Sequence, residues 1–157
     1  MTFQIEGIPV ARFAPLFGLP DEALSELGAV RRIADRKPGF PCRVSLADAE
    51  PGESVLLVNF LHQPAATPYR ARHAIYVREF AQEARLAPGE VPEVLRSRLL
   101  SLRAFDAAGW LLDADVVDGH SLEPALIRLL EPRAVACVHI HNAKPGCYAA
   151  RAVRAPL

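Results

Sequence analysis

The chain has 157 residues, of which 51% are hydrophobic and 23% charged, and 18 basic side chains balance 18 acidic ones. This composition excludes an intrinsically disordered chain, and the length suits a single domain with its own core, residues 1–157. Zero net charge supplies no excess field for phosphate, so we expect no nucleic-acid partner. No apolar run approaches the roughly 20 residues of a spanning helix, and Met1–Glu6 lacks the features of a secretory signal. We therefore expect a cytoplasmic protein with no membrane partner.

The first third of the chain predicts two strands and one short helix. Strands are expected over residues 2–8 and 29–34. Between them, Pro20-Asp21-Glu22 places a proline and two acids where a helix begins, and Gly28 can end that helix. We therefore expect the order strand, helix, strand.

The middle of the chain predicts a hairpin and a long loop. Residues 42–46 and 54–60 flank the turn residues Ala49-Glu50-Pro51-Gly52, which favours antiparallel pairing of the two segments. Residues 61–72 have no apolar period and contain two prolines, so they predict a loop, after which a strand resumes at 73–78. A loop of this length inside a compact domain is typically functional.

Two alternating stretches, 98–105 and 110–117, predict a second hairpin. A loop at Ala107-Ala108-Gly109 brings their apolar faces together, because glycine can adopt the left-handed bulge conformation. In that register Arg103 lies opposite Asp113. We therefore interpret Arg103 as half of a cross-strand ion pair rather than as a ligand-binding residue.

The last third predicts a helix and a closing hairpin. Ser121 can cap an amphipathic helix that runs to about Glu131. Residues 134–141 and 147–153 then pair around a five-residue turn. Because strands come in runs and do not alternate with helices, we expect an α+β fold with a largely antiparallel, curved sheet of about seven or eight strands and two short helices.

The closing hairpin holds a candidate metal site. Alternation along its first strand places Cys137, His139 and His141 on one face, and pairing His141 with Cys147 adds a second thiol. Two imidazoles and a thiolate at this spacing suit zinc or another divalent metal as a cofactor. The alternative is that these histidines are simply polar positions and the thiols are inert.

A second group of residues suits an anionic ligand. Tyr69 and Arg70 lie in the predicted loop, His73 follows it, and Arg43 lies on a predicted strand nearby. Guanidinium, phenol and imidazole groups can together bind a carboxylate or a phosphate, and Asn142 can complete the pocket wall. The alternative is that the arginines are solvated and His73 lies at the edge of the core.

The cysteines suggest a third kind of chemistry. Cys147 and His141 can form a nucleophile–base pair, because catalysis by cysteine requires a thiolate. Cys42 is expected to face inward and to be inert. The three cysteines form an odd set without a C-x-x-C pair, which suits a reducing cytoplasm better than a disulfide framework.

Four ordered blocks of the sequence are distinctive: Phe40-Pro41-Cys42-Arg43, Thr67-Pro68-Tyr69-Arg70 with His73-Ala74-Ile75-Tyr76-Val77, Leu102-Arg103-Ala104-Phe105-Asp106, and His139 to Asn142-Ala143 with Gly146-Cys147-Tyr148. Together they resemble the bacterial family Domain of Unknown Function 1203 over nearly the whole chain. The resemblance implies a stand-alone cytoplasmic bacterial protein and no particular reaction. It also implies that relatives often carry arginine at the position of His141, which favours an anion-binding or structural role for the hairpin over a metal site.

Three functional hypotheses follow from these residues. The first is a protein that binds a small anionic metabolite between loop 61–72 and the closing hairpin. The second is a metal-dependent or cysteine/histidine-dependent enzyme that uses residues 137–147. The third is an interaction module in which the edge of the closing hairpin pairs with a second copy to make a homodimer.

Overall fold

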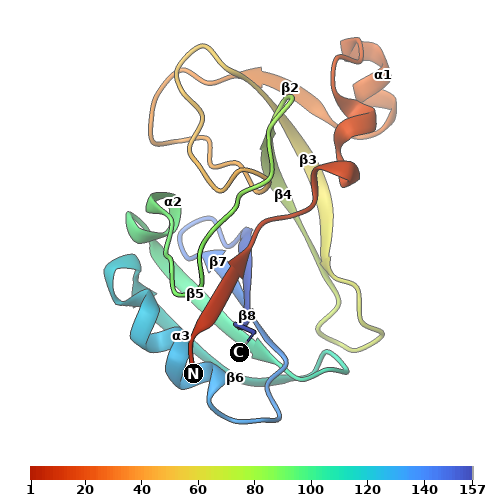
Figure 1. The fold of residues 1–157 in the computed structure, drawn as a ribbon. Helices are drawn as coiled ribbons and strands as arrows, with labels where there is room; N and C mark the ends of the chain where they lie inside the picture. The colour runs from red at the N-terminus through yellow and green to blue at the C-terminus, as the bar shows by residue number, and fades with distance from the viewer. Residues whose placement is uncertain (157) are drawn as a thin grey trace.

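The computed structural model describes residues 1–156 and arranges eight strands in two antiparallel sheets (Figure 1). The larger sheet has the order β1-β8-β7-β5-β6, and the smaller one has the order β2-β3-β4. The α+β class and the number of strands agree with the prediction, but the strands form two sheets and not one. The strands are β1 (Phe3–Glu6), β2 (Val30–Ile33), β3 (Ser54–Gln63), β4 (Ala71–Arg78), β5 (Leu99–Phe105), β6 (Leu111–Asp118), β7 (Cys137–Asn142) and β8 (Tyr148–Arg154).

Helices are few and mostly short. The α-helices are α1 (Asp21–Glu26), α2 (Glu93–Arg96) and α3 (Leu122–Leu130), and the 3-10 turns are η1 (Val10–Arg12), η2 (Ala14–Leu16) and η3 (Gly119–Ser121). The predicted helices after Pro20 and after Ser121 correspond to α1 and α3. Among residues 1–156, no helix is long and apolar enough to cross a membrane.

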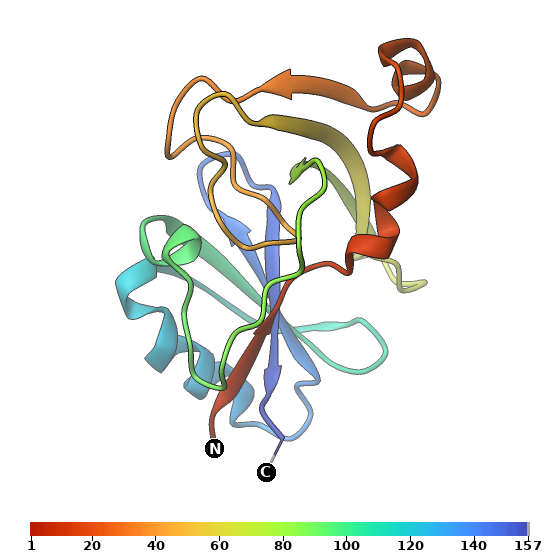
Figure 2. The same cartoon turned by 45° about the horizontal axis from the view of Figure 1, so that its top comes forward.

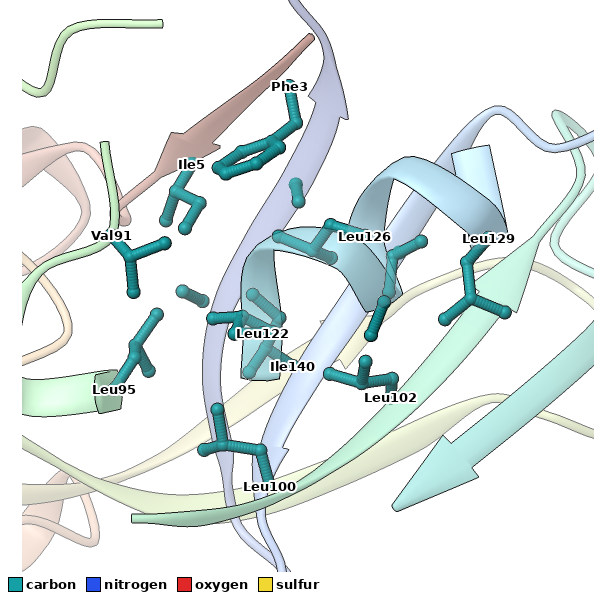
Figure 3. Packing of buried hydrophobic residues seen from close by; sticks show 14 of the residues in the cluster. Phe3, Ile5, Val91, Leu95, Leu100, Leu102, Leu122, Leu126, Leu129 and Ile140 are labelled. Atoms are coloured by element: carbon teal, nitrogen blue, oxygen red, sulfur yellow. The ribbon is translucent and has the colours of Figure 1, made fainter. Parts of the chain in front are cut away.

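Helix α3 covers one face of the larger sheet and builds the main core (Figure 3). Its Leu122 and Leu126 are fully buried, and they pack against Leu100 and Leu102 of β5 and Ile140 of β7. Burying one such side chain contributes roughly 1.5–3 kcal/mol. Because side chains alternate along a strand, the opposite face of β5 and β7 is left to other residues. That opposite face is turned toward the smaller sheet.

Strand β3 is the centre of the smaller sheet and curves strongly (Figure 2). It pairs with β2 on one side and with β4 on the other, so the predicted hairpin between residues 42–46 and 54–60 is wrong. Residues 42–46 contribute only an isolated bridge from Cys42 to Tyr76. The alternating pattern at 42–46 reflects burial without strand pairing, because this segment lies against the core of the smaller sheet.

The loop between β3 and β4 is shorter than predicted. Strand β3 continues to Gln63 and β4 begins at Ala71, with a register shift between Leu61 and Gln63. The antiparallel pairing of β3 with β4 therefore extends into residues whose sequence shows no apolar period. This extension places His62 on a strand and not in a loop.

The register of β5 and β6 is also one residue from the prediction. Arg103 lies opposite Ala114, because a bulge between Ala104 and Phe105 shifts the pairing. Asp113 and its neighbour Asp115 turn to the other face, where both lie within ion-pair distance of Arg128 on α3. The predicted Arg103–Asp113 ion pair is therefore wrong.

The closing hairpin forms, but with a different register. A shift between Ile140 and His141 pairs His141 with Tyr148, where Cys147 was expected. The alternation predicted for β7 is confirmed, since Val138 and Ile140 pack into the core under α3. The shift brings Tyr148 to the histidine face, where it joins the core of the smaller sheet and so connects the two sheets.

The hairpin strands also have no free edge. β7 lies between β8 and β5, and β8 lies between β1 and β7. Pairing of this hairpin with a second copy, as the third hypothesis supposed, therefore has no open backbone within these strands. The outer strands of the larger sheet are β1 and β6.

A candidate metal centre between the two sheets

Three buried histidines meet where the two sheets face each other. His62 comes from the end of β3, and His139 and His141 come from the face of β7 opposite α3. Their exposed fractions are 8%, 5% and 0%, respectively. One ring nitrogen of each lies within 4.8 Å of those of the other two. Such a group can form only where β3 and β7 pack together, because 77 residues separate His62 from His139.

The hydrogen bonds of these rings leave three nitrogens without partners. His141 Nδ1 donates to the carbonyl oxygen of Gly146 at 3.0 Å, so its Nε2 carries the lone pair. That Nε2 has no partner, and neither has Nδ1 of His62 nor Nδ1 of His139. A histidine ligand typically donates its other ring nitrogen to a carbonyl, as His141 does, because this donation orients the ring toward the metal.

The electrostatic environment keeps the rings neutral. Burial lowers the pKa of His62 and of His141 to about 3 and that of His139 to about 4. The charge of Arg103 also lowers these three pKa values. At neutral pH the rings are therefore unprotonated, which is the form that binds a metal.

A fourth histidine and two aromatic rings surround the group. His73 Nδ1 lies 2.7 Å from His62 Nε2, and the two rings are stacked. Tyr148 also stacks on His62, with 5.2 Å between ring centroids, and Phe105 contacts His139 edge-on at 4.9 Å. These contacts hold His62 and His139 in fixed orientations, as a binding site requires.

A large cavity leads to the histidines from one side. Its volume is about 1050 Å³, and its walls include His62, His139, Cys137 and Tyr148. His141 is not part of the wall and is fully buried. A small molecule in this cavity would reach the group over His62 and His139.

The structure brings together some of the predicted metal ligands and separates others. His139 and His141 belong to the three-histidine group, whereas Cys137 and Cys147 do not. His62 takes their place, and the sequence reasoning missed it because residues 61–72 were interpreted as a loop. The sequence contains only five histidines, and four of them lie together at this site. The position of His62 near the other histidines could have been suspected from this small number alone.

The predicted anion-binding residues also separate into two places. Arg43, His73 and Asn142 line one cavity of about 840 Å³, together with Cys147. Tyr69 instead packs against Phe105 and Trp110, and Arg70 donates to the carbonyl oxygen of Pro64. Three of the five residues that were predicted to bind an anion between loop 61–72 and the closing hairpin therefore line this cavity. The rest of its wall comes from other parts of the chain.

Cys147 and His141, the predicted catalytic pair, have separate hydrogen-bond partners. The sulfur of Cys147 accepts from Arg43 Nη2 at 2.9 Å and from Asn142 Nδ2 at 3.7 Å. His141 donates to Gly146, as described above. The group in contact with the thiol is therefore a guanidinium and not an imidazole.

The fold and the site together define a small α+β protein with a buried histidine group between two antiparallel sheets. The chain belongs to the family described as "Protein of unknown function (DUF1203)", whose model matches residues 39–154. This range confirms the resemblance inferred from the four sequence blocks, and it includes all the site residues named above. No curated protein and no solved structure matches the chain.

Proposed function

We propose that this protein binds a divalent transition metal, such as zinc, through His62, His139 and His141. The observation that carries the proposal is that three buried ring nitrogens, one from each residue, lack any hydrogen-bond partner while the three rings converge. Leaving one buried polar atom unsatisfied costs about 1–3 kcal/mol. A metal ion bound to these nitrogens would satisfy all three at once.

The donor set suits a tetrahedral ion with an open position. Zinc commonly takes three histidine ligands and leaves its fourth position to water or substrate. Nitrogens on one tetrahedral zinc are about 3.3 Å apart, so a group that lies within 4.8 Å needs to close by at most about 1.5 Å. His62 makes this set more complete than the pair of histidines that the hairpin offers alone.

The experiment is elemental analysis of untagged protein purified without chelator. We expect close to one equivalent of metal in the wild type and in His120→Ala, because His120 is exposed and lies outside the group. His62→Gln and His141→Asn should lose the metal while they keep a cooperative melting transition. A wild type that carries no metal, takes up no zinc on titration and melts identically with chelator would overturn the proposal.

A small anionic metabolite remains the second proposed ligand. The supporting observation is the cavity lined by Arg43, His73 and Asn142, to which Lys144 adds a further cation. Ligand-induced thermal shifts with a panel of carboxylates and phosphates test this function. The shift should shrink in Lys144→Ala and persist in Arg70→Ala, because Arg70 lies outside that cavity. No shift with any anion would refute it.

We further propose that the protein works in the cytoplasm. All three of its cysteines are free, which suits a reducing compartment. Fractionation of a native host that expresses the protein tests this assignment, and recovery outside the cytoplasmic fraction would refute it.

A further inference from the structure

A buried arginine without a carboxylate partner lies beside Cys147. Arg43 is only 2% exposed, and its guanidinium donates to the carbonyl oxygens of Tyr148 at 2.8 Å and Pro41 at 2.6 Å. Its remaining partner is the sulfur of Cys147. Within residues 1–156, Arg43 forms no ion pair with an aspartate or a glutamate. The sulfur is therefore the contacting group that can carry a compensating negative charge.

Burying an isolated cation is unfavourable. An uncompensated charge in a protein interior is strongly destabilising, whereas a paired and hydrogen-bonded charge is tolerated. Burial lowers the pKa of Arg43, and the nearby sulfurs of Cys147 and Cys42 act in the opposite direction. The sulfur of Cys147 is thus the side-chain group in contact with Arg43 that offsets this cost, because no carboxylate among the described residues does so.

A second, independent observation points to a ligand at the same place. Asn142 is 5% exposed and donates to Cys147 through Nδ2, but its Oδ1 is buried without a hydrogen-bond partner. Asn142, Arg43 and Cys147 all line the cavity of about 840 Å³. The side chain that contacts the sulfur thus keeps an unsatisfied polar atom in the wall of this cavity, as is typical of functional sites.

We propose that Cys147 is a nucleophilic thiol, hydrogen-bonded by Arg43, that reacts with small anionic electrophiles in this cavity. The class of ligand follows from the wall, which adds Arg36 and Lys144 to the guanidinium of Arg43. The inference goes beyond the proposed metal centre, because it uses none of the three histidines, and it rests on the second proposed ligand, because both occupy the same cavity.

The reaction is a simple displacement when the electrophile is a haloacetate. The thiol gives its proton to solvent, a lone pair of the sulfur forms a bond to carbon, the carbon–iodine bond breaks, and iodide leaves with its electron pair. The carboxylate of iodoacetate remains free to contact the cations of the wall. Iodoacetamide has the same reacting carbon and no charge, so the two reagents together separate reactivity from recognition.

The experiment measures alkylation of the folded wild type at neutral pH by peptide mass spectrometry, cysteine by cysteine. Cys147 should react about tenfold faster with iodoacetamide than the same cysteine in an unfolded peptide of this sequence. Cys42 and Cys137 are buried and should react far more slowly, which provides internal controls. Uniform, slow labelling of all three thiols overturns the proposal without any variant that has to fold.

The recognition step is tested with iodoacetate and two surface variants. The ratio of iodoacetate to iodoacetamide rates at Cys147 should exceed that of the peptide, and Lys144→Ala should lower the ratio while Arg70→Ala leaves it unchanged. A ratio equal to that of the peptide overturns the assignment of an anionic ligand. Loss of metal in the histidine variants has no bearing on these rates, so the two proposals fail independently.

Discussion

The buried histidines make a quantitative prediction about acid stability. His62, His139 and His141 have pKa values of about 3, 4 and 3 in the folded protein, against an ordinary value of 6.5. Between pH 7 and pH 5 the unfolded chain takes up protons on these rings that the folded chain does not. Stability is therefore fully present above pH 6.5 and falls as the pH drops toward the folded values.

The expected loss is large compared with the stability of a small domain. Protonation of one histidine in the unfolded state between pH 7 and pH 5 costs the fold about 2 kcal/mol, so three cost about 6 kcal/mol. Typical unfolding free energies are about 5–15 kcal/mol. Carboxylates add little in this window, because Glu79, with a pKa of about 2, exchanges its proton at lower pH.

The assay is urea unfolding of metal-free protein at several pH values from 7 to 5. His141→Asn should flatten the dependence by about a third, because asparagine can still donate to Gly146 but does not titrate. The comparison uses slopes, so a lower overall stability of the variant does not affect it. An unfolding free energy at pH 5 within about 1 kcal/mol of the value at pH 7 would refute the reasoning.

Three further predictions concern stability, all measured by chemical denaturation. Glu79→Gln should cost about 2–3 kcal/mol, because the carboxylate is buried against Arg31, and an unchanged midpoint would contradict the assigned ion pair. Leu126→Ala should cost about 2–5 kcal/mol and the exposed Ile127→Ala much less, so equal losses would contradict the packing of α3. Gly119→Ala should be strongly destabilising, because a Cβ there would clash with the backbone carbonyl oxygen of Leu95 in α2; a neutral effect would show that η3 and α2 can separate.

Side-chain alternation correctly predicted which residues share a face wherever one face of a strand lies on the core. Val138 and Ile140 point under α3, and so His139 and His141 share the opposite face, as expected. The amphipathic period of α3 was equally informative. Both patterns are local, and burial of one face enforces them regardless of what packs on the other face.

The registers between paired strands were less predictable, because single-residue bulges changed which residues lie opposite each other. The extra residue Leu112 in β6 moved Arg103 away from Asp113, and the extra residue Ala149 in β8 exchanged Cys147 for Tyr148 beside His141. A one-residue slip exchanges the side chains on each face, so even a correct hairpin misplaces its polar pairs. No sequence pattern marked either bulge.

The sequence by itself determined the α+β class, the family, the position of most strands along the chain and the histidine face of β7. Only the tertiary structure decided that the strands split into two sheets and that His62 meets His139 and His141 between them. The physical reason is distance along the chain. Periodicity reports which side of an element is buried, whereas the partner across a sheet interface is selected by the packing of segments that lie far apart in sequence.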